Sequence, residues 1–364
     1  MNRPHSYHEV AAPYLDLHQT PHHLLLQFDD LRIDLKTNSL KLVDDLREYY
    51  HEFLAEGEEA SVVVTAIEMP NLDLNLPFVT KERDPGKTSL KEQYVDFPDG
   101  RIVRKIKTGM IFMFGDGDHY AFGSCIENQA QIINFLNNRF IEIVIKRGSL
   151  LFHAAGVAVD GLGLSLAGFS GAGKSTLALH IMRRGTDFIS NDRLMVRRRE
   201  SGLEMIGVPK MPRVNPGTVV NNPSLSSVMS KEEFDRFSRM PTSELWDLEH
   251  KYDAMVDTCF GPNKFKLRAQ MAGLILLHWK RTDDPVVATR VNLKERRDLM
   301  PAFMKDVGLF FEMDDPAETL DFSEQAYLAL LDDCPVLELT GGIDFDAATE
   351  ICLAFLQEQL EKAR

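Results

Sequence analysis

The stretch Gly168-Phe169-Ser170-Gly171-Ala172-Gly173-Lys174-Ser175 decides the fold of the carboxyl-terminal part of this 364-residue chain. It satisfies the pattern G-x-x-x-x-G-K-[ST], in which glycines allow backbone amides to approach and wrap phosphate oxygens. The lysine supplies a cation to the β- and γ-phosphates of a nucleotide, and the serine hydroxyl can hold Mg²⁺. We therefore expect ATP and Mg²⁺ to bind here. The residues expected to contact the nucleotide are Gly168, Ser170, Gly171, Ala172, Gly173, Lys174, Ser175 and Thr176, with Ser175 also a metal ligand.

The segments on either side of this loop have the patterns of a strand and a helix. Residues 162–167 form a short apolar run before the loop, and residues 174–184 form a helical run that Gly185 ends. Short strands that lead into helices continue from residue 150 onward, as in α/β nucleotide-binding domains. The sequence therefore predicts an α/β fold in which the amino end of a helix, with its favourable dipole, faces the phosphates.

A second short strand, residues 187–192, ends in the acid Asp192. Proteins with a phosphate loop use an acid at such a position to reach the metal or the attacking nucleophile. A turn in which Asn191 and Asp192 make local hydrogen bonds is the alternative. Because the phosphate loop precedes this strand, we interpret Asp192 as a catalytic residue and a metal ligand.

His153 precedes the strand that leads to the loop. If residues 151–157 pair beside the loop strand, His153 can point toward the phosphates and orient the acid or the γ-phosphate. A structural, partly buried histidine is the alternative. We count His153 among the candidate catalytic residues, together with Asp192 and Lys174.

The first part of the chain carries a different pattern and no motif of recognisable chemistry. After a polar lead, residues 31–36 alternate between apolar and polar side chains, and Ser39 can cap an amphipathic helix. Residues 101–124 have the pattern of a meander of strands, which another amphipathic helix follows. With a prior of roughly 150 residues per domain, we predict a smaller α+β domain over residues 1–149 and a nucleotide-binding domain over residues 150–364.

Prolines and helical periodicity predict the rest of the second domain. The prolines within residues 207–227 exclude a long helix and suggest a loop that crosses the surface. Lys210 and Arg213 in this loop are interpreted as solvated cations, with clamping of a phosphate or a partner as the alternative. Helices are expected over residues 294–311, 318–331 and 346–362.

Composition and charge exclude several classes of partner. A formal charge of −14 and a pI near 5.3 disfavour capture of nucleic acid or of an anionic membrane surface. The four cysteines lie far apart without a CxxC pair, so neither a zinc site nor a disulfide framework is indicated. No segment approaches the ~18 uninterrupted apolar residues of a membrane span. We expect a cytoplasmic protein that binds neither nucleic acid nor membrane.

Taken together, the motifs resemble the catalytic domain of the bacterial HPr kinase/phosphorylase family. The similarity runs through His153, Gly156-Val157-Ala158-Val159, the phosphate loop with Thr176, and Asn191-Asp192-Arg193. It is greatest for the group called HprK-related kinase B and extends over residues 150–216. The resemblance implies a P-loop nucleotide-binding domain of the HPr kinase type, with ATP and Mg²⁺ as cofactors.

In that family the histidine lies near the active centre, and an acidic pair after the loop serves metal binding and base catalysis on a protein serine. The resemblance therefore implies catalytic roles for His153 and Asp192. This sequence departs from the family at two places. The first acid of the pair is replaced by Asn191, and Phe169 stands where an acid often follows the first glycine of the loop.

The motif Leu203-Glu204-Met205-Ile206-Gly207 is similar to a signature of the same family whose glutamate assists the metal. The arginine of that signature is absent here. The resemblance nevertheless implies that Glu204 is a third metal ligand, beside Ser175 and Asp192. An exposed residue of a hairpin over residues 197–208 is the alternative.

These features favour a kinase that transfers the γ-phosphate of ATP to a hydroxyl group, and the resemblance implies a protein serine as the acceptor. A small-molecule kinase is one alternative. Another is a non-catalytic switch protein, in which the nucleotide orders the proline-rich loop for a partner. The resemblance also implies a homo-oligomer.

Overall fold

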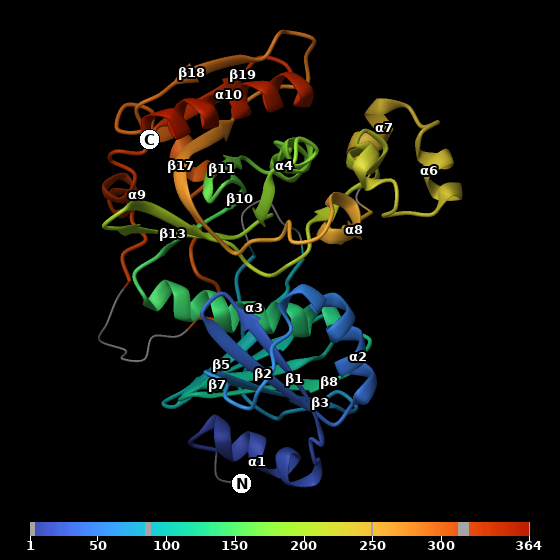
Figure 1. The fold of residues 1–364 in the computed structure, drawn as a ribbon. Helices are drawn as coiled ribbons and strands as arrows, with labels where there is room; N and C mark the ends of the chain where they lie inside the picture. The colour runs from blue at the N-terminus through green and yellow to red at the C-terminus, as the bar shows by residue number, and fades with distance from the viewer. Residues whose placement is uncertain (1–3, 84–88, 249, 312–319, 364) are drawn as a thin grey trace. The chain divides into compact units, whose positions relative to one another are not determined.

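The computed structural model describes residues 4–83, 89–248, 250–311 and 320–363 (Figure 1). By its internal contacts the chain divides into two compact units, one of Met1–Ile143 with Val307–Leu320 and one of Val144–Asp306 with Asp321–Arg364. The predicted division places the boundary between residues 149 and 150 and assigns everything after it to the second domain. The contacts instead group Val307–Leu320 with the first unit. Each unit has a large sheet of its own.

The first unit is built on a mixed sheet whose described strands follow the order β1-β2-β3-β8-β7-β6-β5-β4. β3 lies parallel to both β2 and β8, and the other neighbouring strands are antiparallel. α3 packs on this sheet through Phe135, whose ring centre lies 4.9 Å from that of Phe112. The elements are α1 (Tyr7–Leu17), β1 (His22–Phe28), β2 (Leu31–Thr37), α2 (Leu40–Tyr49), η1 (His51–Phe53), β3 (Val62–Glu68), β4 (Val79–Thr80), β5 (Glu92–Phe97), β6 (Gly100–Lys105), β7 (Ile111–Gly115), β8 (Asp118–Gly123) and α3 (Gln129–Lys146).

Several predicted elements of this unit are confirmed. The side chain of Ser39 caps α2 by accepting a hydrogen bond from the Leu42 N–H at 3.2 Å. The meander predicted over residues 101–124 is observed as β6, β7 and β8. β1, in contrast, lies in the stretch that we interpret from sequence as a polar lead. Its three leucines at 24–26 are buried, but a run of three apolar residues beside two histidines shows no alternation that would identify a strand.

The second unit is built on a mixed sheet whose described strands follow the order β12-β10-β11-β17-β14-β13-β9, with β19 beside β17 and β18 beside β19. β17 is parallel to β11 and β19, and the other pairs are antiparallel. α4 and α10 pack against each other and against β11 (Figure 1). The predicted α/β class is thus confirmed.

The elements of the second unit are β9 (Leu150–Phe152), β10 (Ala154–Val159), β11 (Leu162–Gly168), α4 (Lys174–Met182), β12 (Asp187–Ser190), β13 (Leu194–Arg199), β14 (Gly202–Ile206), β15 (Arg213–Val214), α5 (Pro216–Val220), η2 (Pro223–Leu225), α6 (Lys231–Phe237), α7 (Thr242–Asp247), β16 (Tyr252–Asp253), α8 (Val256–Phe260), β17 (Arg268–Leu277), β18 (Val287–Arg290), η3 (Arg297–Ala302), α9 (Glu324–Leu330), β19 (Val336–Thr340) and α10 (Phe345–Ala363).

β10 and β11 form a hairpin that leads directly into the phosphate loop. The turn between them consists of Asp160 and Gly161 alone. Both residues have positive φ, 50° and 79°, as two-residue hairpin turns that match the twist of the strands require. β10 begins at Ala154, which lies opposite Ala167 of β11. His153 and the phosphate loop therefore lie at the same end of the hairpin.

Two predictions for this unit are wrong. The helix expected over residues 294–311 is reduced to the 3₁₀ helix η3, because Pro301 cannot donate a backbone hydrogen bond and interrupts an α-helix. The proline-rich residues 207–227 are not a surface loop, since Val208, Met211 and Val219 are buried and the segment contains α5 and η2.

The other two predicted helices are observed. The one expected over residues 318–331 is shorter than predicted, because α9 begins only at Glu324 after its cap Ser323, and residues 318 and 319 lie outside the described residues. The one over residues 346–362 appears as α10. Within the described parts of the chain, no helix combines the length and the apolar character needed to cross a membrane.

Gly207 follows β14 and passes directly over β12. A Cβ atom built on Gly207 would lie 1.8 Å from the carbonyl oxygen of Ile189. We expect Gly207→Ala to lower the free energy of unfolding by roughly 2–4 kcal/mol, because the backbone of β12 must shift to admit the methyl group. Urea unfolding measures this change. Gly308→Ala is the matched control, since a Cβ there meets no atom within 4 Å. A Gly207→Ala protein as stable as wild type would contradict this packing.

Candidate functional site

The phosphate loop, residues 168–175, turns from the end of β11 into the first turn of α4. Gly171 and Gly173 have φ of 81° and 88°, in the left-handed region that other residues rarely adopt. The Ala172 N–H donates to the Phe169 carbonyl at 3.0 Å and closes a tight turn. Phe169, Ser170 and Gly171 are exposed, so this part of the loop is open to solvent.

The side chains predicted to contact the nucleotide lie around the first turn of α4. Lys174 is buried, and its Nζ donates to the Gly168 carbonyl at 2.9 Å, so that the cation lies across the loop. Ser175 is half-buried. The Thr176 Oγ1 lies 2.8 Å from the Thr218 Oγ1, which ties α4 to α5. The structure thus brings these residues together on one turn.

Two aromatic side chains from distant parts of the chain support the loop. The Trp279 Nε1 donates to the Ala172 carbonyl at 2.8 Å. The ring of Phe345, at the start of α10, packs edge to face on Trp279 with ring centres 5.3 Å apart. A Cβ on Gly173 would lie 2.9 Å from Phe345 Cζ, so only glycine fits beneath this ring. No sequence signal identifies either aromatic residue, because both act across more than a hundred residues of chain.

His153 and Asp192 reach the loop because of the strand order. β12 runs antiparallel to β10, so the residues after Ser190 lie at the same end of the sheet as the phosphate loop. His153 is the single residue between β9, which pairs with β13, and β10, which pairs with β11. Its N–H donates to the Phe303 carbonyl at 2.8 Å. The His153 Nε2 lies 3.1 Å from the Asp192 Oδ1, so the two side chains form a pair.

The charges around Asp192 keep its carboxylate ionised. Burial works to raise the pKa of Asp192, but the hydrogen bond with His153 and the charges of Arg193 and Lys210 outweigh burial and hold the pKa well below its usual range. The side chain is 58% exposed, so solvent screens part of this effect. Burial lowers the pKa of Lys174, and the negative charge of Asp192 opposes that shift. The acid and the lysine therefore lie close enough to interact electrostatically.

Lys210 is a second cation near Asp192. It belongs to residues 207–218, which we call the strap, and it is the one residue of 207–212 that is not fully buried. The Val208 N–H donates to the Ser190 Oγ at 3.4 Å, which attaches the strap to the end of β12. Burial lowers the pKa of Lys210, whereas the carboxylate of Asp192 raises it. Lys210 is thus partly exposed and also lies within electrostatic reach of Asp192.

Glu204 lies away from the phosphate loop. It stands on β14 at the level of Leu162, the first residue of β11. Six residues of β11, or roughly 20 Å of strand, separate that level from Gly168. The Glu204 carboxylate accepts hydrogen bonds from Arg197 Nε at 2.6 Å and Arg268 Nη1 at 2.8 Å. The structure therefore does not bring Glu204 to the other predicted metal ligands, and we do not retain it as one.

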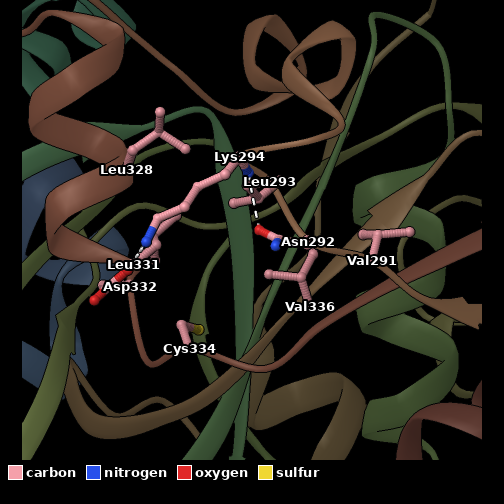
Figure 2. A pocket seen from close by; sticks show the side chains of 9 residues that line it. All are labelled: Val291, Asn292, Leu293, Lys294, Leu328, Leu331, Asp332, Cys334 and Val336. Atoms are coloured by element: carbon pink, nitrogen blue, oxygen red, sulfur yellow. Dashed lines mark hydrogen bonds and ion pairs between the residues drawn. The ribbon is translucent and has the colours of Figure 1, made fainter.

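A cavity of about 250 Å³ lies near the start of β19 (Figure 2). The phosphate loop, in contrast, is level with the end of β19, because Gly168 and Leu339 both lie beside Leu277. Figure 2 shows the side chain of Lys294 reaching Asp332, and the two make an ion pair at 2.5 Å. No predicted site residue lines this cavity. The lining residues are Val291, Asn292, Leu293, Lys294, Leu328, Leu331, Asp332, Cys334 and Val336.

Comparison with known proteins finds relatives over part of the chain. No protein-family model matches it. The HPr kinase/phosphorylase of Shouchella clausii (strain KSM-K16) is 26% identical over 131 residues, which are 35% of this chain and 40% of that protein. The HPr kinase/phosphorylase of Geobacillus kaustophilus (strain HTA426) is 25% identical over 130 residues, again 35% and 40% of the two chains. The chain thus matches about two fifths of the length of these curated relatives.

Among solved structures, the Hpr(Ser) kinase/phosphatase from Coxiella burnetii aligns with a TM-score of 0.30 and 12% identity, covering 58% of this chain and 91% of that one. A TM-score this low supports no conclusion about the fold. The sequence matches are independent of it and agree with one another in the family that they name. Over about a third of its length, this chain is related to the HPr kinase/phosphorylases.

Proposed function

We propose that this protein is a phosphotransferase that moves the γ-phosphate of Mg-ATP to a hydroxyl group, and that the acceptor is a protein serine. One observation carries the proposal. A phosphate loop with its lysine and the His153–Asp192 pair converge at the same end of one sheet. The relatives named for kinase activity support the reaction class. The serine acceptor and the closer tie to HprK-related kinase B are suggested by the family resemblance.

The donor atoms of the site fit Mg-ATP. The backbone amides of the loop and the amino end of α4 suit the phosphates, and Lys174 suits the β- and γ-phosphates. Mg²⁺ prefers oxygen ligands, which the Ser175 hydroxyl and the Asp192 carboxylate offer. The Asn191 Oδ1 is buried without a hydrogen-bond partner among the described residues, so it is a third oxygen that a cation would satisfy. Bound Mg²⁺ would neutralise charge on the phosphates during transfer.

On the acceptor side, Asp192 and His153 act on the hydroxyl group. A carboxylate whose pKa is held low is a weak base. We therefore propose that Asp192 orients the hydroxyl group and does not remove its proton early in the transfer. His153 donates from Nε2 to Asp192 and keeps the carboxylate oriented. Lys210 stabilises the negative charge that gathers where the phosphoryl group leaves ATP.

Incubation of the purified protein with Mg-ATP, radiolabelled at the γ-phosphate, and a cell extract tests the proposal. We expect a protein of the extract to gain phosphoserine, which mass spectrometry identifies. Label in a small molecule would support a small-molecule kinase instead. Bound ATP without turnover in any fraction would support a nucleotide-dependent switch. A cytoplasmic location and a homo-oligomer belong to the same proposal, and light scattering after size-exclusion chromatography measures the oligomer.

Glu204→Gln tests whether the Glu204 carboxylate, on β14, takes part in Mg²⁺ binding. The variant is expected to keep Mg²⁺-dependent ATP binding within about twofold of wild type, because the carboxylate lies far from the loop. It should lower the free energy of unfolding by about 1–3 kcal/mol, because Arg197, whose side chain is 6% exposed, loses its charged partner. Calorimetric ATP titrations at several Mg²⁺ concentrations and urea unfolding measure the two effects. A higher Mg²⁺ requirement in the variant would restore Glu204 as a ligand.

A further inference from the structure

His278 lies beside the phosphate loop, on the side of β11 opposite to His153. β11 and β17 are parallel, and Leu277, the last residue of β17, pairs with Gly168, the last residue of β11. The residues that follow are therefore neighbours, and the rings of Phe169 and His278 have centres 6.1 Å apart. Ligands of such sheets bind beyond the carboxyl ends of the parallel strands. His278 thus lies at the edge of the sheet where a nucleotide is expected.

A buried carboxylate holds the imidazole of His278. The Nδ1 of this ring lies 2.7 Å from the Glu338 Oε1. Glu338 stands on β19 with its side chain 5% exposed, whereas the side chain of His278 is 44% exposed. The carboxylate already has a charged partner, since Arg296 donates to both of its oxygens, at 2.7 and 3.0 Å. Glu338 therefore does not need His278 as a counter-charge, and the contact fixes the orientation of an exposed ring.

The charge of Glu338 decides which ring nitrogen of His278 faces it as a donor. Burial works to raise the pKa of Glu338, but hydrogen bonds from Arg296 and His278 outweigh burial and hold the pKa below its usual range. An ionised carboxylate only accepts hydrogen bonds, so Nδ1 is the donor of this pair. The other ring nitrogen, Nε2, makes no hydrogen bond with a described residue. Nε2 can therefore contact a ligand.

The position of Lys174 indicates where the terminal phosphates of a nucleotide lie. Its Nζ donates to the carbonyl of Gly168, the first residue of the loop, at 2.9 Å. The lysine of a phosphate loop contacts the β- and γ-phosphates, so these phosphates are expected near the start of the loop. Asp192 acts on the charge of Lys174 and so lies near the same place. His153 and His278 therefore flank this end of the loop from the two neighbouring strands, β10 and β17.

We propose that His278 donates a hydrogen bond from Nε2 to an oxygen of the γ-phosphate. This inference rests on the proposed function, since a nucleotide must occupy the phosphate loop. With Nδ1 donating to Glu338, the ring donates from Nε2 only as the imidazolium. The carboxylate on one side of the ring and the phosphate on the other both favour this cation. The other charged groups near the ring, Arg296 and Asp298, have opposite signs and pair with each other at 2.9 Å.

The same contact acts during transfer. The bond between the γ-phosphorus and the oxygen of the leaving ADP breaks while the bond to the acceptor oxygen forms, and negative charge is spread over the outer oxygens of the phosphoryl group. The imidazolium of His278 stabilises that charge and keeps its own proton throughout. Asp192 and the acceptor hydroxyl lie on the side of His153. The phosphoryl group is therefore contacted from both strands that flank β11.

Two nucleotides that differ by the γ-phosphate test this contact: Mg-ADP, and the Mg²⁺ complex of the β,γ-imido analogue of ATP, which resists cleavage. Isothermal titration of the full chain measures both affinities. We expect His278→Ala to weaken binding of the analogue about 10- to 100-fold, as for a charged hydrogen bond, and to leave the ADP affinity within about twofold. His278→Gln keeps a donor without the charge and should lose less. Lys294→Ala is the control, because it removes a cation at the other end of β19.

The outcomes are distinct from those that test the proposed function. An unchanged ADP affinity shows that His278→Ala folds correctly around the loop. Equal losses for both nucleotides, or no loss for either, would overturn the contact with the γ-phosphate, while binding by the wild-type protein still supports the phosphate site. Wild-type protein that binds neither nucleotide would overturn the contact and the proposed function together.

Discussion

Asp192→Asn is expected to lower kcat for phosphoryl transfer by about 10³-fold or more, while the ATP affinity changes less than about fivefold. The amide keeps the size of the side chain and can still contact His153 at the position where Nε2 lies 3.1 Å from Oδ1 in the wild type. It removes the negative charge to which we assign acceptor orientation and metal binding. ATP retains the loop amides and Lys174. Initial rates with a phosphorylatable acceptor give kcat, and calorimetry gives the ATP affinity.

Asp187→Asn is the matched control for this experiment. Asp187 is the first residue of β12, at the end remote from the loop, and its Oδ1 lies 3.4 Å from Lys264 Nζ. The same chemical change there should leave kcat within about twofold. Removing one group that stabilises a transition state electrostatically typically lowers kcat by about 10²-fold or more. Our assignment of Asp192 therefore fails if Asp192→Asn retains a tenth or more of the wild-type kcat.

Lys174→Met is expected to lower kcat/KM for ATP by about 10²- to 10³-fold through weaker nucleotide binding. The loss has a simple physical cause, because the cation that lies across the loop is gone and the phosphates lose their charged partner. The unliganded protein should nevertheless be at least as stable as wild type. Burial lowers the pKa of Lys174, which shows that the buried charge is costly, and methionine fills a similar volume without charge. Thermal unfolding and ATP titration measure the two effects.

Lys210→Met provides the contrast, because the strap lies on the acid side of the site. We expect ATP affinity close to wild type and a kcat about 10- to 100-fold lower. Lys294→Met is the control for loss of a lysine charge, since Lys294 pairs with Asp332 beside the separate cavity. Equal losses of ATP affinity in Lys174→Met and Lys210→Met would mean that Lys210 has no separate part in transfer.

The parts of the site that the sequence predicts are those built from short, consecutive segments. The phosphate loop can be recognised from its own glycines and lysine, which stand between a predicted strand and a predicted helix. The convergence of His153 and Asp192 with the loop depends on β10, β11 and β12, which follow one another within residues 154–190. Neighbouring elements in sequence usually pack side by side, so local patterns suffice there.

The parts that the sequence does not predict depend on pairing between distant segments. Trp279 and Phe345 support the loop only because β17 and α10 come to lie against it. Glu204 and Lys210 are six residues apart in sequence, yet only Lys210 lies near Asp192, because the chain leaves β14 and passes over β12 between them. The strand register and the course of the strap decide this difference, and neither is encoded in a local motif.

The hairpin of β10 and β11 couples the site to a turn that lies far from it. His153 and the phosphate loop are at its open end, and the turn of Asp160 and Gly161 is at its closed end, six residue pairs away. A two-residue turn sets the register of every one of those pairs, and side chains on a strand alternate between faces. A slip of this register by one residue would move the side chains of β10 to the opposite face of the sheet while the loop motif stayed intact. The length of this distant turn therefore helps to fix where His153 lies relative to the phosphate loop.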